Sequence, residues 1–153
     1  MKFRMVDRIL SWAPGVSIGG AKTVSFEEYC LKAPFGDAER LPESLLVESF
    51  FELMSWFVIL SSDFRSLAIV TGVRRVTFDG PLEPGERMVL RVDLREERRG
   101  ALRFDGVGRV GKRRVALVEG CLAKAALLSS YFDPGDLRIL YREIYRPEEA
   151  KAP

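Results

Sequence analysis

The chain has 153 residues, 47% of them hydrophobic and 30% charged, so one soluble globular domain is the simplest expectation. Its 24 basic and 22 acidic residues leave a net charge of +2, which gives no global attraction to nucleic acid. The longest apolar run, residues 45–60, is shorter than the roughly 20 residues that span a bilayer and contains Glu48 and Glu52. These features exclude a strongly basic nucleic-acid-binding protein and argue against a membrane span.

The N-terminal residues MKFRMVDRILSW do not resemble a signal peptide. Asp7 and Arg8 fall where an uninterrupted apolar segment would be needed, and no small-residue cleavage pattern follows, so we expect a cytoplasmic protein. Cys30 and Cys121 are far apart, no CxxC motif occurs, and the chain contains no histidine. We therefore expect reduced thiols rather than a disulfide or a metal site, and no cofactor.

The first predicted elements are a strand and a long helix. Residues 16–25, VSIGGAKTVS, predict a strand with a bulge or a close backbone approach at the glycine pair. Residues 26–33 are expected to form a short helix or a turn, and a loop follows over residues 34–40. Pro42 and Glu43 suit the start of a helix that runs to about Leu60.

Apolar residues cover most of the circumference of this predicted helix, which indicates that other structure wraps it. A thin polar stripe interrupts them at spacings of four, four and three. Its members are Ser44, Glu48, Glu52 and Ser55.

Strand patterns separated by turn signals begin at Ser66. They predict strands over residues 66–78, 88–97, 101–110 and 114–125, connected by DGPLEPGE, RRG and GKR. Three or four long strands joined by short turns would form an antiparallel meander. One buried helix together with such a meander implies an α+β fold in which a sheet wraps around the helix.

The last segment predicts a short amphipathic helix. Asp133 can cap it, Pro134 can occupy its first position, and apolar residues recur at 137, 140, 141 and 144. We expect residues 1–147 to form a single domain and residues 148–153 to form a flexible tail.

Several strings resemble the hot-dog-fold β-hydroxyacyl-acyl carrier protein dehydratases of fatty-acid synthesis. MVDRILSWAPGVSIGGAKTVS is similar to the opening of that family, and LPESLLVESF is similar to the start of its central helix. VRRVTFDGPLEPGERMVLRVDL and FDGVGRVGKRRVALVEG resemble its later strands. The resemblance covers about residues 3–124 and implies an antiparallel sheet around one long central helix, here with an extra C-terminal helix.

The resemblance also assigns the family's active-site positions. In that family a helix Glu works as an acid–base group, and a His in a His-Phe-Pro-Gly loop removes the α-proton of a thioester. The helix Glu falls on Glu48 and the loop Phe on Phe35, but the His position holds Pro34. Gly36 and Asp37 replace the Pro-Gly pair. Proline has no titratable side chain, so the base does not carry over.

Other residues near these positions have alternative interpretations. Glu48 is either a solvated surface residue or an acid in an acyl tunnel, where burial would raise its pKa. The candidate substrate-binding residues are Phe35, Gly36, Asp37 and Glu52, and Glu52 alternatively pairs with a basic residue across a dimer. Asp37, Tyr29 and Cys30 are the nearby candidates for a substitute base, none of them at a defensible spacing.

Three function hypotheses follow from these residues. The first is a dehydratase-like protein that binds 3-hydroxyacyl or enoyl thioesters of acyl carrier protein or coenzyme A, with impaired or altered catalysis. The second is an acyl thioesterase that uses Glu48 or Asp37 to activate water. The third is a non-catalytic acyl-binding protein or a partner in a mixed dimer.

We also expect at least a homodimer, because a single sheet of this kind leaves one edge unpaired. Arg74 and Arg75 are either solvated strand residues or the docking site for an acidic carrier or a phosphopantetheine phosphate.

Overall fold

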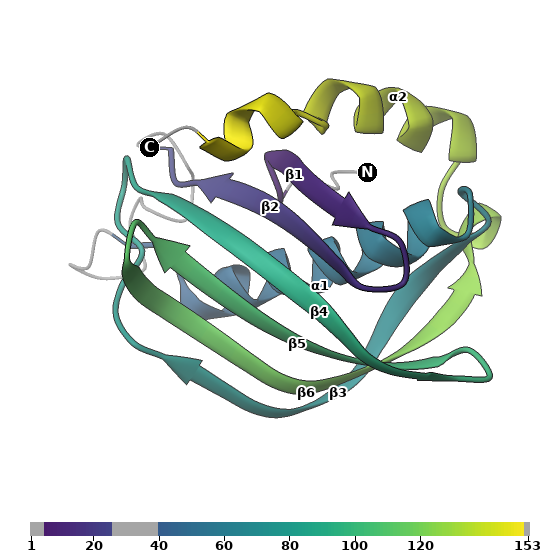
Figure 1. Cartoon of the computed structure of the whole chain (residues 1–153), viewed down its shortest axis with the longest axis horizontal. Coiled ribbons are helices and arrows are strands. Elements are labelled where there is room, and N and C mark those ends of the chain that lie inside the picture. Colours follow the sequence, from purple (N-terminus) through teal and green to yellow (C-terminus); the bar gives the residue numbers. More distant parts are fainter. Residues whose placement is uncertain (1–4, 26–39, 152–153) are drawn as a thin grey trace.

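The computed structural model describes residues 5–25 and 40–151, which form a curved antiparallel sheet around a long helix (Figure 1). The strand order across the sheet is β1-β2-β4-β5-β6-β3. The strands are β1 Arg8–Ala13, β2 Ser17–Thr23, β3 Ser66–Phe78, β4 Arg87–Arg98, β5 Ala101–Val110 and β6 Arg113–Leu127. The helices are α1 Glu43–Ser61 and α2 Pro134–Ile144, with 3₁₀ turns η2 Leu128–Ser130 and η3 Pro147–Lys151. The predicted wrapped-helix architecture is confirmed.

Helix α1 begins directly after Pro42, as predicted, and it forms the centre of the core. Phe50 and Leu53 are fully buried against strands of the sheet, and Trp56 is fully buried beside Tyr141 of α2. The helix is long and apolar enough to cross a membrane by length and composition alone, but most of it is buried inside the fold. Its apolar surface is therefore used by the protein's own core.

Strand β1 was not predicted. Of the two predicted meander sizes, three or four strands, the structure has the three-strand one, because β3 does not pair with β4. Only β4, β5 and β6 form the meander, through two-residue turns at Arg99–Gly100 and Gly111–Lys112. Residues 79–86 instead carry the chain past the β5–β6 turn, where Arg113 donates a hydrogen bond to the Pro81 carbonyl. The Pro and Gly residues of this connection are typical of a turn. The connection nevertheless crosses from β3 to β4, which are separated in the sheet by β6 and β5.

The glycine pair of β2 lies where neighbouring backbone and side-chain atoms come very close to the strand. The sequence analysis gave such a close approach as one of its two alternatives, the other being a bulge. A Cβ atom at Gly20 would stand 2.9 Å from the Arg8 carbonyl oxygen and 3.0 Å from the Leu53 side chain. The pairing of β1 with β2 shifts register between Ile9 and Ser11, opposite these glycines. The irregularity therefore lies in β1, and the glycines let α1 pack closely on β2.

The C-terminal segment packs over the region near β1. Asp133 caps α2 by accepting hydrogen bonds from the backbone N–H groups of Gly135 and Asp136, as predicted. Tyr141 contacts the rings of Trp56 and Phe64, and Leu137 and Ile144 are buried. Residues 147–151, which include part of the segment expected to be flexible, form η3, and Glu149 pairs with Arg8 at 3.3 Å. The mobility of residues 148–153 stays a prediction.

We predict that Gly106→Ala destabilises the protein by about 1–3 kcal/mol, because a Cβ atom there would lie 2.7 Å from the Phe50 ring. Phe50 is fully buried in the core, so its ring has little room to move. Gly72→Ala in β3 is the matched control, since nothing lies within 4 Å of its added Cβ. Chemical denaturation of both variants tests this, and equal stabilities would contradict the packing argument.

Candidate functional site

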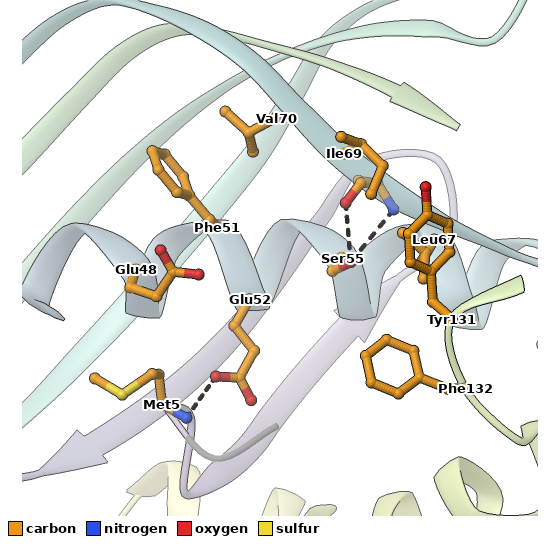
Figure 2. A pocket seen from close by; sticks show the side chains of 11 residues that line it. Met5, Glu48, Phe51, Glu52, Ser55, Leu67, Ile69, Val70, Tyr131 and Phe132 are labelled. Carbon is orange, nitrogen blue, oxygen red and sulfur yellow. Dashed lines mark hydrogen bonds between the residues drawn. The ribbon is translucent and has the colours of Figure 1, made fainter. Parts of the chain in front are cut away.

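A cavity of about 470 Å³ lies between α1, the first half of β3 and the segment after η2 (Figure 2). Its walls combine the polar stripe of α1 with apolar side chains. They comprise Glu48, Phe51, Glu52 and Ser55 of α1, residues 67–70 of β3, Tyr131, Phe132 and Met5. Three of the four residues of the predicted stripe therefore share one cavity.

Ser55 joins α1 to strand β3 at the back of the cavity. Its Oγ donates to the Ala68 carbonyl at 3.2 Å and accepts from the Ala68 N–H at 3.3 Å. Ala68 lies opposite Ala125 in the β3–β6 ladder, and the Ala125 N–H is donated to the Gly100 carbonyl on the other side of β6. Ser55 thus fixes the first half of β3 against the helix, which sets the width of the cavity.

Glu52 is buried in the cavity wall, with 5% of its surface exposed. Its Oε2 accepts a short hydrogen bond from the Met5 backbone N–H, and its Oε1 is buried with no hydrogen-bond partner in the described residues. Desolvation raises the pKa of this carboxyl to about 8, against the lowering effects of the Met5 hydrogen bond and of the nearby Val6 backbone. The negative charges of Asp7 and Glu48 raise the pKa further.

Glu48 lines the same cavity one helical turn earlier, but its side chain is exposed in the single chain. Exposure of Glu48 in the single chain fits the first of its two interpretations and its place in the cavity lining fits the second, and the buried carboxyl is Glu52. Glu48 is exposed because it lies in the first half of α1, where the rest of the chain covers the helix less completely than around residues 52–60. Figure 2 shows the Glu52 carboxyl directed toward the Met5 backbone, with Glu48 one turn earlier on the same helix.

Several predicted site residues lie outside the described part of the chain. These are Tyr29, Cys30, Pro34, Phe35, Gly36 and Asp37. Arg74 and Arg75 are exposed in the second half of β3, whereas the cavity is lined by the first half. Cys121 is a buried free thiol, as predicted, and burial raises its pKa to about 11, so it is not a reactive group at neutral pH.

The sequence did not identify two contributors to the cavity, namely the N-terminal segment and the residues after η2. Met5 reaches the site only because β1 lies beside β2 and brings residues 5–7 across α1. Tyr131 and Phe132 reach it because η2 follows β6 at the end of the strand ladder. No local pattern signals either contact, since both depend on strand pairing between distant residues.

The arrangement gives a carboxylate pair in an otherwise largely apolar cavity, without an obvious cation among the lining residues described. Such a site can bind an uncharged polar group and can donate or accept a proton at a carboxyl. Residues 5–25 and 40–151 contain no group of three His, Cys, Asp or Glu side chains placed to hold a metal ion.

Comparison with known proteins gives one family match and several fold matches. Residues 1–119 match the family described as FabA-like domain. A 3-hydroxyacyl-[acyl-carrier-protein] dehydratase, FabZ, from Histophilus somni is 32% identical over 110 residues, which cover 71% of this chain and 73% of that protein. The sequence resemblance is therefore confirmed at the level of the family.

Two solved structures share the fold at low sequence identity. The dehydratase heterocomplex ApeI:P from Xenorhabdus doucetiae matches with a TM-score of 0.65 and 13% identity, covering 90% of this chain and 89% of that one. A hypothetical thioesterase with coenzyme A from Streptococcus pneumoniae matches with a TM-score of 0.60 and 10% identity, covering 78% and 85%. Together with the sheet and the central helix, these matches establish the hot-dog fold.

We predict that Glu52 makes the free energy of unfolding depend on pH. Its folded pKa of about 8 lies above its ordinary value of 4.5, so the folded state keeps a proton that the unfolded state releases. The contribution of Glu52 to stability is full below about pH 4.5 and falls by about 1.4 kcal/mol per pH unit until about pH 8.

Glu52→Gln should remove this slope, so the variant should gain stability relative to the parent protein as the pH rises from 5 to 8. Urea unfolding at several pH values measures the difference. Glu43→Gln, a change at an exposed position in the first turn of the same helix that does not act on the Glu52 pKa, is the control and should keep the parental slope. A constant difference between the parent and Glu52→Gln across this range would contradict the prediction.

Proposed function

The chain belongs to the FabA-like domain family, and from this premise we propose that its cavity binds acyl thioesters of the 3-hydroxyacyl or enoyl type, with impaired or altered catalysis. The observation that carries the proposal is the placement of Glu48 and Glu52 in a cavity otherwise lined largely by apolar side chains. Acyl thioesters combine an apolar chain with a few polar atoms, and pockets of roughly 300–1,000 Å³ commonly hold ligands of this kind.

We propose that the thioester is carried on acyl carrier protein or coenzyme A. The relative from Histophilus somni is named for an acyl carrier protein substrate, and the Streptococcus pneumoniae structure contains coenzyme A. Fatty-acid-type metabolism and a cytoplasmic location accord with this proposal. Arg74 and Arg75 are the proposed docking pair for the acidic carrier or the phosphate, because both guanidinium groups are exposed.

Catalysis in this proposal is limited by the missing histidine. Dehydration of a 3-hydroxyacyl thioester needs a base for the α-proton and an acid for the departing hydroxyl. Glu48 is the candidate acid–base group by its alignment, and Pro34 supplies no base. A single carboxyl cannot readily serve both roles, because one role needs it ionised and the other needs it protonated.

A thioesterase is the second candidate, because a carboxylate at Glu48 could activate water against a thioester carbonyl. A non-catalytic partner of an active subunit is the third candidate. The open edge of β3 favours assembly with a second chain, and the Xenorhabdus doucetiae neighbour is described as a heterocomplex.

We propose that the second chain is a copy of this one and that it pairs along β3. The sheet has two edge strands, β1 and β3. The β1 edge is partly covered, since the Arg146 N–H donates to the Ile9 carbonyl and Ile9 bridges to Tyr145. The β3 edge exposes Ile69 next to the cavity, so pairing there would bury apolar surface and close the site.

We expect a particle of twice the 17.3 kDa chain mass in light scattering at micromolar concentration. Ile69→Lys should shift the protein toward the monomer, because a charged lysine opposes pairing at a strand edge. Ile139→Lys, at an exposed isoleucine on α2, is the matched control and should leave the mass unchanged. A parent protein of 17.3 kDa under these conditions would contradict the homodimer.

We expect the purified protein to bind 3-hydroxyacyl thioesters but to dehydrate them poorly. Losing one positioned acid–base group typically lowers the rate by about 10²–10⁴-fold, so turnover should fall at least this far below that of a histidine-containing relative. Calorimetry measures binding, and ultraviolet absorbance of the enoyl product measures turnover.

Saturated acyl thioesters provide the second arm, in which release of the free thiol would identify a thioesterase. Rapid dehydration that is abolished by Glu48→Gln would refute impaired catalysis. Absence of binding to any acyl thioester, by the homodimer and by coexpressed mixed dimers, would refute the proposed function itself.

A further inference from the structure

The carboxyl of Glu52 is the most deeply buried titratable group in the cavity wall that the expected chemistry leaves unused. Its side chain is 5% exposed, and one of its oxygens, Oε2, is occupied by the Met5 backbone N–H. The other oxygen, Oε1, is buried and has no hydrogen-bond partner in the described residues. A buried polar atom in a native protein normally has a partner, so this oxygen requires an explanation.

The charged groups that act on Glu52 favour its neutral form. Asp7, on the N-terminal segment, and Glu48, on the same helix, both place negative charge near it. Strand β3 contributes apolar side chains to this cavity, and Tyr131 contributes a phenol. Lys22 lies on β2, on the same face as Gly20, and takes part in an interaction of its own. Burial is the largest cause of the raised pKa, about 8, and so the carboxyl carries its proton at neutral pH.

The hydrogen-bonding pattern favours Oε1 as the oxygen that carries the proton. Oε2 accepts the Met5 N–H, and a neutral carboxyl keeps an accepting oxygen and one hydroxyl donor. The hydroxyl is therefore Oε1–H, the atom that lacks a partner within the described chain. A buried donor without a partner costs free energy, and a ligand oxygen in the cavity would remove that cost.

We propose that Glu52 is a ligand-binding residue whose Oε1–H donates a hydrogen bond to an oxygen acceptor of the bound molecule. The class of ligand rests on the proposed function, so the acceptor is the thioester carbonyl or the 3-hydroxyl oxygen. Such a neutral carboxylic acid would also polarise a carbonyl without adding a negative charge to the cavity. Because Asp7 and Glu48 are close, the same site disfavours free carboxylate ligands.

The test measures the dissociation constants of three coenzyme A derivatives between pH 6 and 9.5. These are a saturated acyl-coenzyme A, the matching 3-hydroxyacyl-coenzyme A, and an S-alkyl-coenzyme A thioether that has neither the carbonyl nor the hydroxyl. The thioether shares the ionising groups of coenzyme A, so it reports every pH effect that does not involve the acceptor oxygen.

For the parent protein we expect thioester affinity to fall about five- to tenfold as the pH rises through 8, relative to the thioether. Glu52→Gln should bind without this pH dependence, because its amide N–H donates at every pH. Glu52→Leu should bind thioesters about five- to tenfold more weakly at pH 6.5 and bind the thioether unchanged. A pH effect confined to the 3-hydroxyacyl derivative assigns the hydroxyl as acceptor, and an equal effect on the saturated derivative assigns the carbonyl.

Thioester binding that is independent of pH and equal in the parent and Glu52→Leu would overturn the role of Glu52 while leaving the proposed function intact. Failure of the parent to bind any of the thioesters would overturn the proposed function instead. If Glu52→Leu does not fold, the comparison of the parent with Glu52→Gln tests the role of Glu52. Only a carboxyl that loses its proton would make thioester affinity fall with rising pH in the parent and not in Glu52→Gln.

Discussion

The burial of α1 on nearly every side is the constraint on which the rest of the structure depends. Its apolar residues surround the helix axis, so a sheet that is flat or packed on one side would leave apolar surface in water. The sheet curves closely around the helix, and Gly20 and Gly106 admit the Leu53 and Phe50 side chains at short range. A carboxyl on such a helix is consequently desolvated, and the environment of Glu52 follows from the packing that stabilises the fold.

The cavity exists where this wrapping is incomplete. Ser55 holds β3 to the helix through the Ala68 backbone, and the segment after η2 forms the far wall. β3 is also an edge strand with Ile69 exposed, and Ser55 occupies its backbone only at Ala68 in the described residues, whereas C-terminal residues cover part of the β1 edge. Site and open edge therefore adjoin, so a second chain added along β3, as we propose, would complete the cavity as well as the sheet.

Two carboxyls one helical turn apart occupy different environments in this cavity. Glu48 is exposed in the single chain, and Glu52 is buried with its pKa raised to about 8. The cavity therefore offers a ligand one accessible carboxyl and one desolvated carboxyl. Because Pro34 occupies the histidine position, we propose that these two carboxyls are the groups that bind a thioester or act on it.

The sequence by itself determined the central helix, its polar stripe, the β4–β6 hairpins and the capped C-terminal helix, because these depend on local periodicity and turn residues. It also identified the family through strings spread over most of the chain. Tertiary structure decided the rest. The place of β3 beside β6, the pairing of β1 with β2 and the approach of Met5 to Glu52 are contacts between distant residues. The choice of Glu52 over Glu48 as the buried carboxyl depends on which turn of α1 the sheet and the N-terminal segment cover, and both residues have the same local sequence signal.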